Sequence, residues 1–176
     1  MKIKMILTAL IEAKSPFWRP IKYSLFPPLG MATLAAYADP DDEVTICDEH
    51  VEELKTDDRP DLVVIQAYIT SAIRSYEIAD LYRAKGCYVC LGGLHATSLP
   101  EEAALHADTV FIGPGEDTWP LFLAEYRSGR PRKRYVSGNP GMETLPFPRR
   151  DLLKRSLYLV PNSIVVTRGC PHRCDF

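Results

Sequence analysis

The chain has 176 residues, 46% of them hydrophobic, and a formal net charge of −2, which is typical of one globular domain with an extension. The nearly balanced charge gives no global attraction to nucleic acid or to an anionic membrane, so we expect no nucleic-acid partner. No apolar run reaches about 18 residues and no secretory cleavage site follows the N-terminus, so we expect no membrane span and a cytoplasmic location.

Short apolar runs alternate with helical patterns through the first 129 residues. Buried parallel strands read as continuous apolar runs, and their alternation with helices favours βαβ units. The sequence therefore predicts an α/β domain, a flavodoxin-like (Rossmann-like) doubly wound sheet of five parallel strands. The predicted strands are residues 3–10, 44–47, 62–66, 88–91 and 109–112. Two helices are predicted at residues 29–38 and 71–85. A further helix is predicted after a capping box at Ser98–Glu101, and another is predicted to start at the cap Asp117 and to run to Gly129.

Cys87 and Cys90 have the CxxC spacing of redox-active pairs. Such pairs normally open a helix, whose dipole lowers the thiol pKa, whereas these two cysteines fall in an apolar run that reads as a buried strand. Residues three apart on a strand point to opposite faces of the sheet. We therefore expect both thiols to be buried core residues.

Residues 130–160 differ from the preceding domain, because they contain four prolines and a short basic run. This composition is typical of a linker, and so short a basic run is usually solvated surface. We expect a short helix over residues 152–159. Residues 163–167 would then form the first strand of a second domain, which would begin at residue 161.

The last ten residues, TRGCPHRCDF, are the most specific part of the sequence. Cys170 and Cys174 lie four apart directly after a predicted strand, and thiolates in such a loop are the usual ligands of an iron–sulfur cluster. Zinc is an alternative, with His172 as a third ligand, because zinc sites accept a similar thiol spacing. A disulfide is disfavoured by the odd number of cysteines and the lack of an extracellular pattern.

The loops after the predicted strands are the expected ligand site, since ligands of open α/β sheets bind beyond the carboxyl ends of the strands. Two of these loops, at Gly92-Gly93 and at Gly113-Pro114-Gly115, are rich in glycine and precede helices. Glycine lets the backbone approach a ligand closely, but it can also serve only the tight turn from strand to helix. From the residues alone both interpretations stay open.

The order of these features resembles the cobalamin-binding domain that precedes many radical S-adenosylmethionine (SAM) domains. The resemblance covers the whole chain and implies a protein cut within the CxxxCxxC cluster motif. Residues 1–129 would be the cobalamin domain, 130–160 the linker, and 161–176 the start of a truncated radical SAM domain. The motifs that carry it are Pro27-Pro28-Leu29-Gly30, Gly92-Gly93-Leu94-His95, Gly113-Pro114-Gly115-Glu116 and the terminal TRGCPxxC.

In that family the nucleotide tail of cobalamin inserts at the carboxyl ends of the strands. The resemblance therefore implies contacts with the tail from Thr70, Ser71, Gly92, Gly93, Leu94, His95, Gly113 and Gly115. For His95, a structural hydrogen bond is an equal alternative. The resemblance also implies that Cys170 and Cys174 bind a [4Fe–4S] cluster.

One departure concerns the cobalt ligand. Mutase-type cobalamin domains carry DxHxxG after the first strand, and its histidine binds cobalt. This chain has a DxH only at Asp48-Glu49-His50, after the second predicted strand and without the later glycine. We therefore expect no histidine ligand to cobalt.

The implied parent enzyme is a radical SAM methyltransferase that acts on an unactivated carbon or phosphorus centre. Its cofactors would be cobalamin, a [4Fe–4S] cluster and SAM, and its partners a small-molecule or lipid-like substrate and an electron donor for the cluster. The fragment alone is expected to be inactive, because the third cysteine and the barrel are missing. Two alternatives stay open: a cobalamin-free substrate-recognition or docking domain, and a cobalamin-linked radical SAM cyclase or oxidoreductase.

Overall fold

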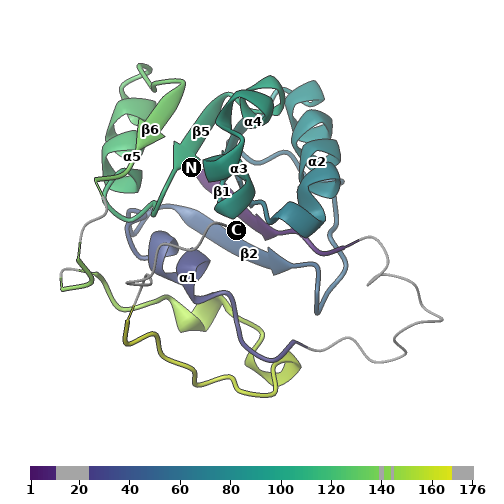
Figure 1. Cartoon of the computed structure of the whole chain (residues 1–176), viewed down its shortest axis with the longest axis vertical. Coiled ribbons are helices and arrows are strands. Elements are labelled where there is room, and N and C mark those ends of the chain that lie inside the picture. The colour runs from purple at the N-terminus through teal and green to yellow at the C-terminus, as the bar shows by residue number, and fades with distance from the viewer. Residues whose placement is uncertain (11–23, 139–140, 144, 168–176) are drawn as a thin grey trace, which may run out of the picture.

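A six-stranded parallel sheet forms the centre of the molecule (Figure 1). The computed structural model describes residues 1–10, 24–138, 141–143 and 145–167. The strands lie in the order β2-β1-β3-β4-β5-β6. The chain adds β2 on one side of β1 and the later strands on the other side, so the switch point of the sheet lies between β1 and β3. Their bounds are β1 Lys2–Leu7, β2 Glu43–Asp48, β3 Leu62–Gln66, β4 Tyr88–Gly92, β5 Thr109–Ile112 and β6 Arg134–Val136.

Helices cover both faces of the sheet (Figure 1). The helices are α1 Leu29–Ala35, α2 Ala72–Ala84, α3 Leu94–Ser98, α4 Pro100–His106 and α5 Trp119–Arg127. Helices α2, α3 and α4 share one buried core with the sheet, and α1 and α5 share the other. Neighbouring strand residues alternate between the two cores, as Val63 and Val64 do, which explains why the strands read as unbroken apolar runs. None of the helices in the described ranges is long and apolar enough to cross a membrane.

The predicted fold class is confirmed, and each of the five predicted strands is present. The sequence did not predict β6, which pairs in parallel with β5 from within the stretch that we interpreted as a linker. Of its three residues only Tyr135 is buried. The Tyr135 ring stacks on Phe111 at a centroid distance of 5.3 Å. A single buried side chain next to basic residues gives too short a pattern to identify a strand.

Two predicted helix caps are wrong. Ser98 is the last residue of α3, and its Oγ donates to the carbonyl of Leu94 at 2.9 Å instead of capping α4. The residue before α5 is Thr118, which makes no side-chain cap. The carboxylate of Asp117 instead accepts from the backbone N–H of Gly138 at 2.8 Å. Both helices have proline in their first positions, where its missing N–H would be unpaired anyway.

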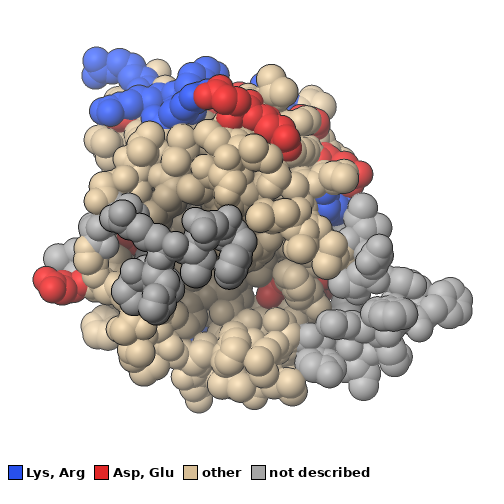
Figure 2. Space-filling model, in the orientation of Figure 1, with Lys and Arg blue, Asp and Glu red and all other residues tan. Residues whose placement is uncertain are grey.

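The basic run after α5 lies on the surface beside acidic residues. Figure 2 shows Lys and Arg gathered at one end of this face, next to Asp and Glu, while the middle of the face carries few charges. Arg132 pairs with Glu125, and Arg134 pairs with Glu101. These ion pairs neutralise part of the positive charge, so this part of the surface carries both positive and negative side chains.

Residues 145–160 fold back onto the domain, and we name this segment the C-terminal strap. It starts after β6, at one edge of the sheet, and reaches β2 at the other edge. The backbone N–H of Arg149 donates to the carbonyl of Ala32 in α1 at 2.9 Å, and that of Leu159 donates to the carbonyl of Ser24 at 3.0 Å. The second half of the predicted linker is therefore attached to the domain.

Side chains fix the end of the strap to β2. The hydroxyl of Tyr158 donates to the carboxylate of Asp48 at 3.1 Å, and both side chains are buried. We predicted a helix over residues 152–159, but that segment contains only the 3-10 turn at Arg155–Leu157 and the last residue of another at Arg150–Leu152. Residues 163–167 have no regular secondary structure, and residues 168–176 lie outside the described ranges, so the start of a second domain stays a prediction.

Cys87 and Cys90 are both buried, and they belong to the two different cores. This confirms that they point to opposite faces of the sheet. Burial raises the pKa of both thiols, and that of Cys90 lies well above its usual range. A thiol with a raised pKa yields little of the thiolate that reacts with labelling reagents.

We therefore expect Cys87 and Cys90 to resist thiol reagents in the folded protein and to react once urea unfolds it. Mass spectrometry of the labelled peptides measures each site separately. The unfolded sample is the control for reagent activity. Fast labelling of both residues in the native state, or a disulfide between them, would contradict the burial.

Candidate functional site

A cavity of about 740 Å³ opens at the carboxyl ends of the strands, on the face that α1 and α5 cover. We name it the carboxyl-edge cavity. It lies at the edge of the sheet where open α/β folds bind their ligands. Of the residues expected to contact a ligand, the cavity is lined by Gly92, Gly93, Leu94, Gly113 and Gly115.

Gly92 contributes to this space, because it interrupts a row of side chains on the sheet. Leu7 lies in register with Gln66, and Gln66 lies in register with Gly92. A Cβ atom at position 92 would have the Cβ of Phe111 as its neighbour at 3.5 Å, which is an ordinary contact. No other atom of the described residues, outside its chain neighbours, would come within 4 Å. The missing side chain therefore leaves a gap over β4.

Two further glycines keep the opposite wall of the cavity open. Gly30, in the first turn of α1, has no described atom within 4 Å of the place where its Cβ would stand. A Cβ at Gly115 would lie 3.5 Å from the side chain of Leu34 in α1. Glycine inside a helix costs up to about 1 kcal/mol relative to alanine. Gly30 therefore leaves room in the cavity at some expense of helix stability.

Gly93 serves the turn between β4 and α3. Its φ is 98°, in the left-handed region that side chains disfavour. A Cβ there would lie 2.7 Å from the carbonyl oxygen of Ala67. The same carbonyl accepts the N–H of His95 at 3.1 Å. The two interpretations of the glycines thus apply to different residues: Gly92 leaves space, and Gly93 permits a tight turn.

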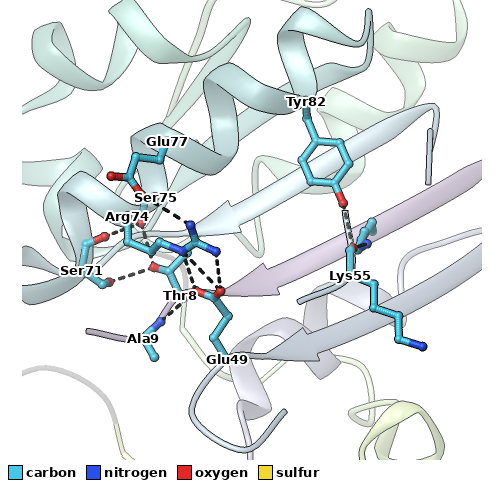
Figure 3. Close-up of polar contacts among 10 residues, drawn as sticks. Thr8, Ala9, Glu49, Lys55, Ser71, Arg74, Ser75, Glu77 and Tyr82 are labelled. Atoms are coloured by element: carbon cyan, nitrogen blue, oxygen red, sulfur yellow. Dashed lines mark hydrogen bonds and ion pairs between the residues drawn. The ribbon is translucent and has the colours of Figure 1, made fainter. Parts of the chain in front are cut away.

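Thr70 and Ser71 do not line the cavity. Thr70 is exposed in a 3-10 turn, and Ser71 is buried. Figure 3 shows the side chains of Ser71 and Ser75 pointing toward Thr8. The Thr8 hydroxyl oxygen lies 2.8 Å from each of the two serine hydroxyl oxygens. These hydroxyl groups satisfy one another and join the end of β1 to α2.

A buried ion pair lies beside these hydroxyl groups. The carboxylate of Glu49 is fully buried, and the guanidinium of Arg74 approaches it to 2.9 Å (Figure 3). The backbone N–H of Ala9 also donates to Glu49, at 3.4 Å. A buried carboxylate needs such partners, because burial without them is costly. This pair attaches α2 to the ends of β1 and β2.

His95 also lies outside the lining of the cavity. Its Nε2 is 2.9 Å from the hydroxyl of Tyr76 and 3.3 Å from the carboxylate of Glu102. Burial and the hydrogen bond to Glu102 raise the pKa of Tyr76, so its hydroxyl stays protonated. His95 thereby ties α3 to α2 and α4. Its contacts are those of a structural hydrogen bond, and the neighbouring Leu94 lines the cavity.

The deepest part of the cavity consists of residues that the sequence analysis did not single out. Five side chains, each less than a tenth exposed, form what we name the apolar floor: Met5, Met31, Val64, Phe111 and Trp119. The indole N–H of Trp119 is buried and has no acceptor among the described residues. In the sequence these residues look like ordinary core positions, so no signal distinguishes them before the fold is known.

His50 does not line the carboxyl-edge cavity, and none of the described lining residues is a histidine. The Nδ1 of His50 lies 2.8 Å from one carboxylate oxygen of Asp48, and the other oxygen accepts from Tyr158. Asp48 therefore joins His50 to the strap. This arrangement gives the DxH sequence a structural role at the edge strand β2.

A second hollow of about 810 Å³ lies at the amino ends of the strands, opposite the carboxyl-edge cavity. It is lined by residues such as Arg59, Asp61, Arg83 and Asp108, and Arg83 and Asp108 pair with each other. We favour the carboxyl-edge cavity as the functional site, although it is slightly smaller. Most of its lining residues are apolar, and it lies where ligands bind in this fold.

The predicted cluster ligands Cys170 and Cys174 lie outside the described residues. Within the described ranges, no group of three or more His, Cys, Asp or Glu side chains could hold a metal ion. The expected [4Fe–4S] site therefore stays a prediction.

Comparison with known proteins identifies the family of this chain. The model of a family described as "B12 binding domain" matches residues 23–123, which include most of the cavity lining. Several curated proteins are similar over most of this chain. They are the bacteriochlorophyllide d C-8(2)-methyltransferase of Chlorobaculum tepidum, 33% identical over 84% of this chain, an uncharacterized methyltransferase of Synechocystis, 32% identical over 86%, and the hopanoid C-2 methylase of Rhodopseudomonas palustris, 26% identical over 87%.

The matches extend over only part of these relatives. The chain covers 35% of the Chlorobaculum protein, 29% of the Synechocystis protein and 30% of the hopanoid methylase. It thus spans about a third of the length of the curated relatives that it matches.

Proposed function

Because the chain belongs to the B12-binding domain family, we propose that it binds cobalamin and that the nucleotide tail enters the carboxyl-edge cavity. The observation that carries this proposal is the space left by Gly30 and Gly92 between α1 and the sheet. Cavities of about 300–1,000 Å³ enclose drug-sized molecules. Cobalamin as a whole is far larger, so only its tail fits inside.

The residues of the cavity fit such a tail. A planar base needs an apolar surface, and the floor supplies two aromatic side chains, Phe111 and Trp119, which pack on each other with ring centroids 5.7 Å apart and planes tilted by 57°. The unpaired indole N–H of Trp119 suits a ligand that brings an acceptor atom. Gly92 and Gly115 let the ligand pass close to the backbone. Bound cobalamin would supply a cobalt centre that can carry a methyl group.

We further propose that the whole protein is a methyltransferase of the radical SAM type. The curated relatives are named methyltransferases or a methylase, and the terminal TRGCPHRC has the spacing that opens a cluster motif. In this proposal the chain holds cobalamin at the carboxyl ends of the strands, while Cys170 and Cys174 help to hold a [4Fe–4S] cluster that binds SAM. The transferred group would reach an unactivated centre of the substrate.

Incubation with hydroxocobalamin, followed by desalting, tests the first proposal. We expect the protein to retain cobalamin near one equivalent, with the absorption spectrum of the base-off form and no histidine ligand. His50→Ala should retain as much, because His50 pairs with Asp48 and lies outside the cavity. A well-folded protein that retains no cobalamin would contradict the proposal, and loss of binding on His50→Ala would place the site elsewhere.

The cluster proposal needs a longer form of the protein that continues beyond Phe176. After anaerobic reconstitution, that form should contain about four irons and four sulfides per chain. Replacing both Cys170 and Cys174 with alanine should remove the cluster, whereas Cys87→Ala should leave it. Stoichiometric zinc without iron would contradict the proposal.

A further inference from the structure

The carboxyl-edge cavity is chemically uneven from its floor to its opening. The side chains of the apolar floor offer hydrocarbon, aromatic rings and two thioether sulfurs, and their one N–H donor is that of Trp119. Polar lining residues such as Gln66 and Thr97 are more exposed. Gln66 donates to the hydroxyl of Tyr68 at 2.9 Å, and Thr97 accepts the N–H of Gly113 at 3.0 Å. The floor thus combines one unpaired donor with no strong side-chain acceptor.

Other polar groups near the cavity already have partners. Glu116, a buried carboxylate of the lining, has an interaction of its own. The backbone groups of β1 and β3 below the floor pair within the parallel sheet. Among the five side chains of the apolar floor, a hydrogen-bond donor of a ligand would find only the weakly accepting sulfur atoms of Met5 and Met31.

From this chemistry we propose that the apolar floor makes the domain selective for the lower base of the cobamide, favouring dimethylbenzimidazole over adenine. This inference rests on the proposed binding of the nucleotide tail in the cavity. Dimethylbenzimidazole carries two methyl groups and one ring nitrogen that can accept a hydrogen bond. The methyl groups match the hydrocarbon of the floor, and the nitrogen matches the donor of Trp119.

Adenine fits the same space poorly for a chemical reason. Its exocyclic amine carries two N–H donors, and against the floor these would lose their water without gaining a strong acceptor among the floor side chains. Leaving a buried donor unsatisfied weakens binding by roughly 10- to 100-fold. Val64, at the centre of the floor, is 7% exposed, so water cannot easily replace the missing acceptor.

The experiment compares three corrinoids on the same protein by fluorescence quenching or by equilibrium dialysis: cobalamin, adeninylcobamide, and cobinamide, which lacks the tail. We expect cobalamin to bind roughly 10- to 100-fold more tightly than adeninylcobamide. Cobinamide should bind the weakest of the three. Equal affinity for the two complete cobamides would overturn the selectivity and leave the proposed function intact. Equal affinity for cobalamin and cobinamide would show that the tail does not enter the cavity, and binding of none would overturn both proposals.

A matched pair of variants tests the floor itself. Val64→Thr places a hydroxyl group, which can accept a hydrogen bond, in the floor. Val63→Thr places the same group in the core on the other face of β3. We expect Val64→Thr to reduce the preference for cobalamin by about 3- to 10-fold and Val63→Thr to leave it unchanged. Thermal melts show whether each variant folds. If a variant does not fold, the comparison of the three corrinoids on the unaltered protein still decides whether the domain is selective for the lower base. An unchanged preference in folded Val64→Thr would overturn the role of the floor.

Discussion

Replacing Gly92 with leucine should lower the affinity for cobalamin by roughly 100-fold or more. The backbone of Gly92 is not in the left-handed region, and a Cβ there makes only one ordinary contact with a described neighbour, Phe111. The longer leucine side chain would extend into the space over β4 that the nucleotide tail is proposed to occupy. Hydroxocobalamin titration measures the effect.

Gly92→Ala is the matched control for this experiment. Its single added methyl group fits at 3.5 Å from the Cβ of Phe111, so it should bind cobalamin with a smaller loss. Circular dichroism and thermal melts should show both variants folded. Tight binding by folded Gly92→Leu would mean that the tail does not pass over β4.

Gly93→Ala, one residue further along, should act on the fold instead. It should lower the free energy of unfolding by about 3 kcal/mol, because the side chain meets both an unfavourable φ and a backbone oxygen of Ala67 at 2.7 Å. Urea denaturation measures the change. Gly92→Ala again provides the comparison, since the two substitutions add the same atoms to neighbouring residues. Equal unfolding midpoints for Gly93→Ala and the unaltered protein would contradict the strain.

The sequence was informative about the fold wherever burial made a long apolar run. The strands from β1 to β5 are such runs, and their alternation with helices predicted a parallel sheet. It was uninformative at β6, where Tyr135 alone is buried. It was also misleading at Ser98, because serine in a short helix can bond to its own helix as easily as cap the next.

The candidate site was predictable as a place and less so as a set of residues. The glycine-rich loops pointed to the carboxyl ends of the strands, where the carboxyl-edge cavity lies, and Gly92 and Gly115 line that cavity. The family resemblance implied ligand contacts for Ser71 and His95, but in the structure their polar groups bond to neighbours within the fold. Which hydroxyl or imidazole remains for a ligand depends on tertiary contacts. The same limit hid Trp119, whose buried indole N–H has no acceptor among the described residues.

For protein engineering, the strap changes where this domain can be cut. A graft that stopped at Gly129 would discard Tyr135, which stacks on Phe111, and would remove the Tyr158 hydroxyl that donates to one carboxylate oxygen of Asp48. A transplanted module that extends through residue 160 keeps both contacts. The end of such a module lies on the β2 side of the sheet. This is five strand spacings, or roughly 24 Å, from the edge strand β6. A fusion partner would therefore need its attachment point on the β2 side.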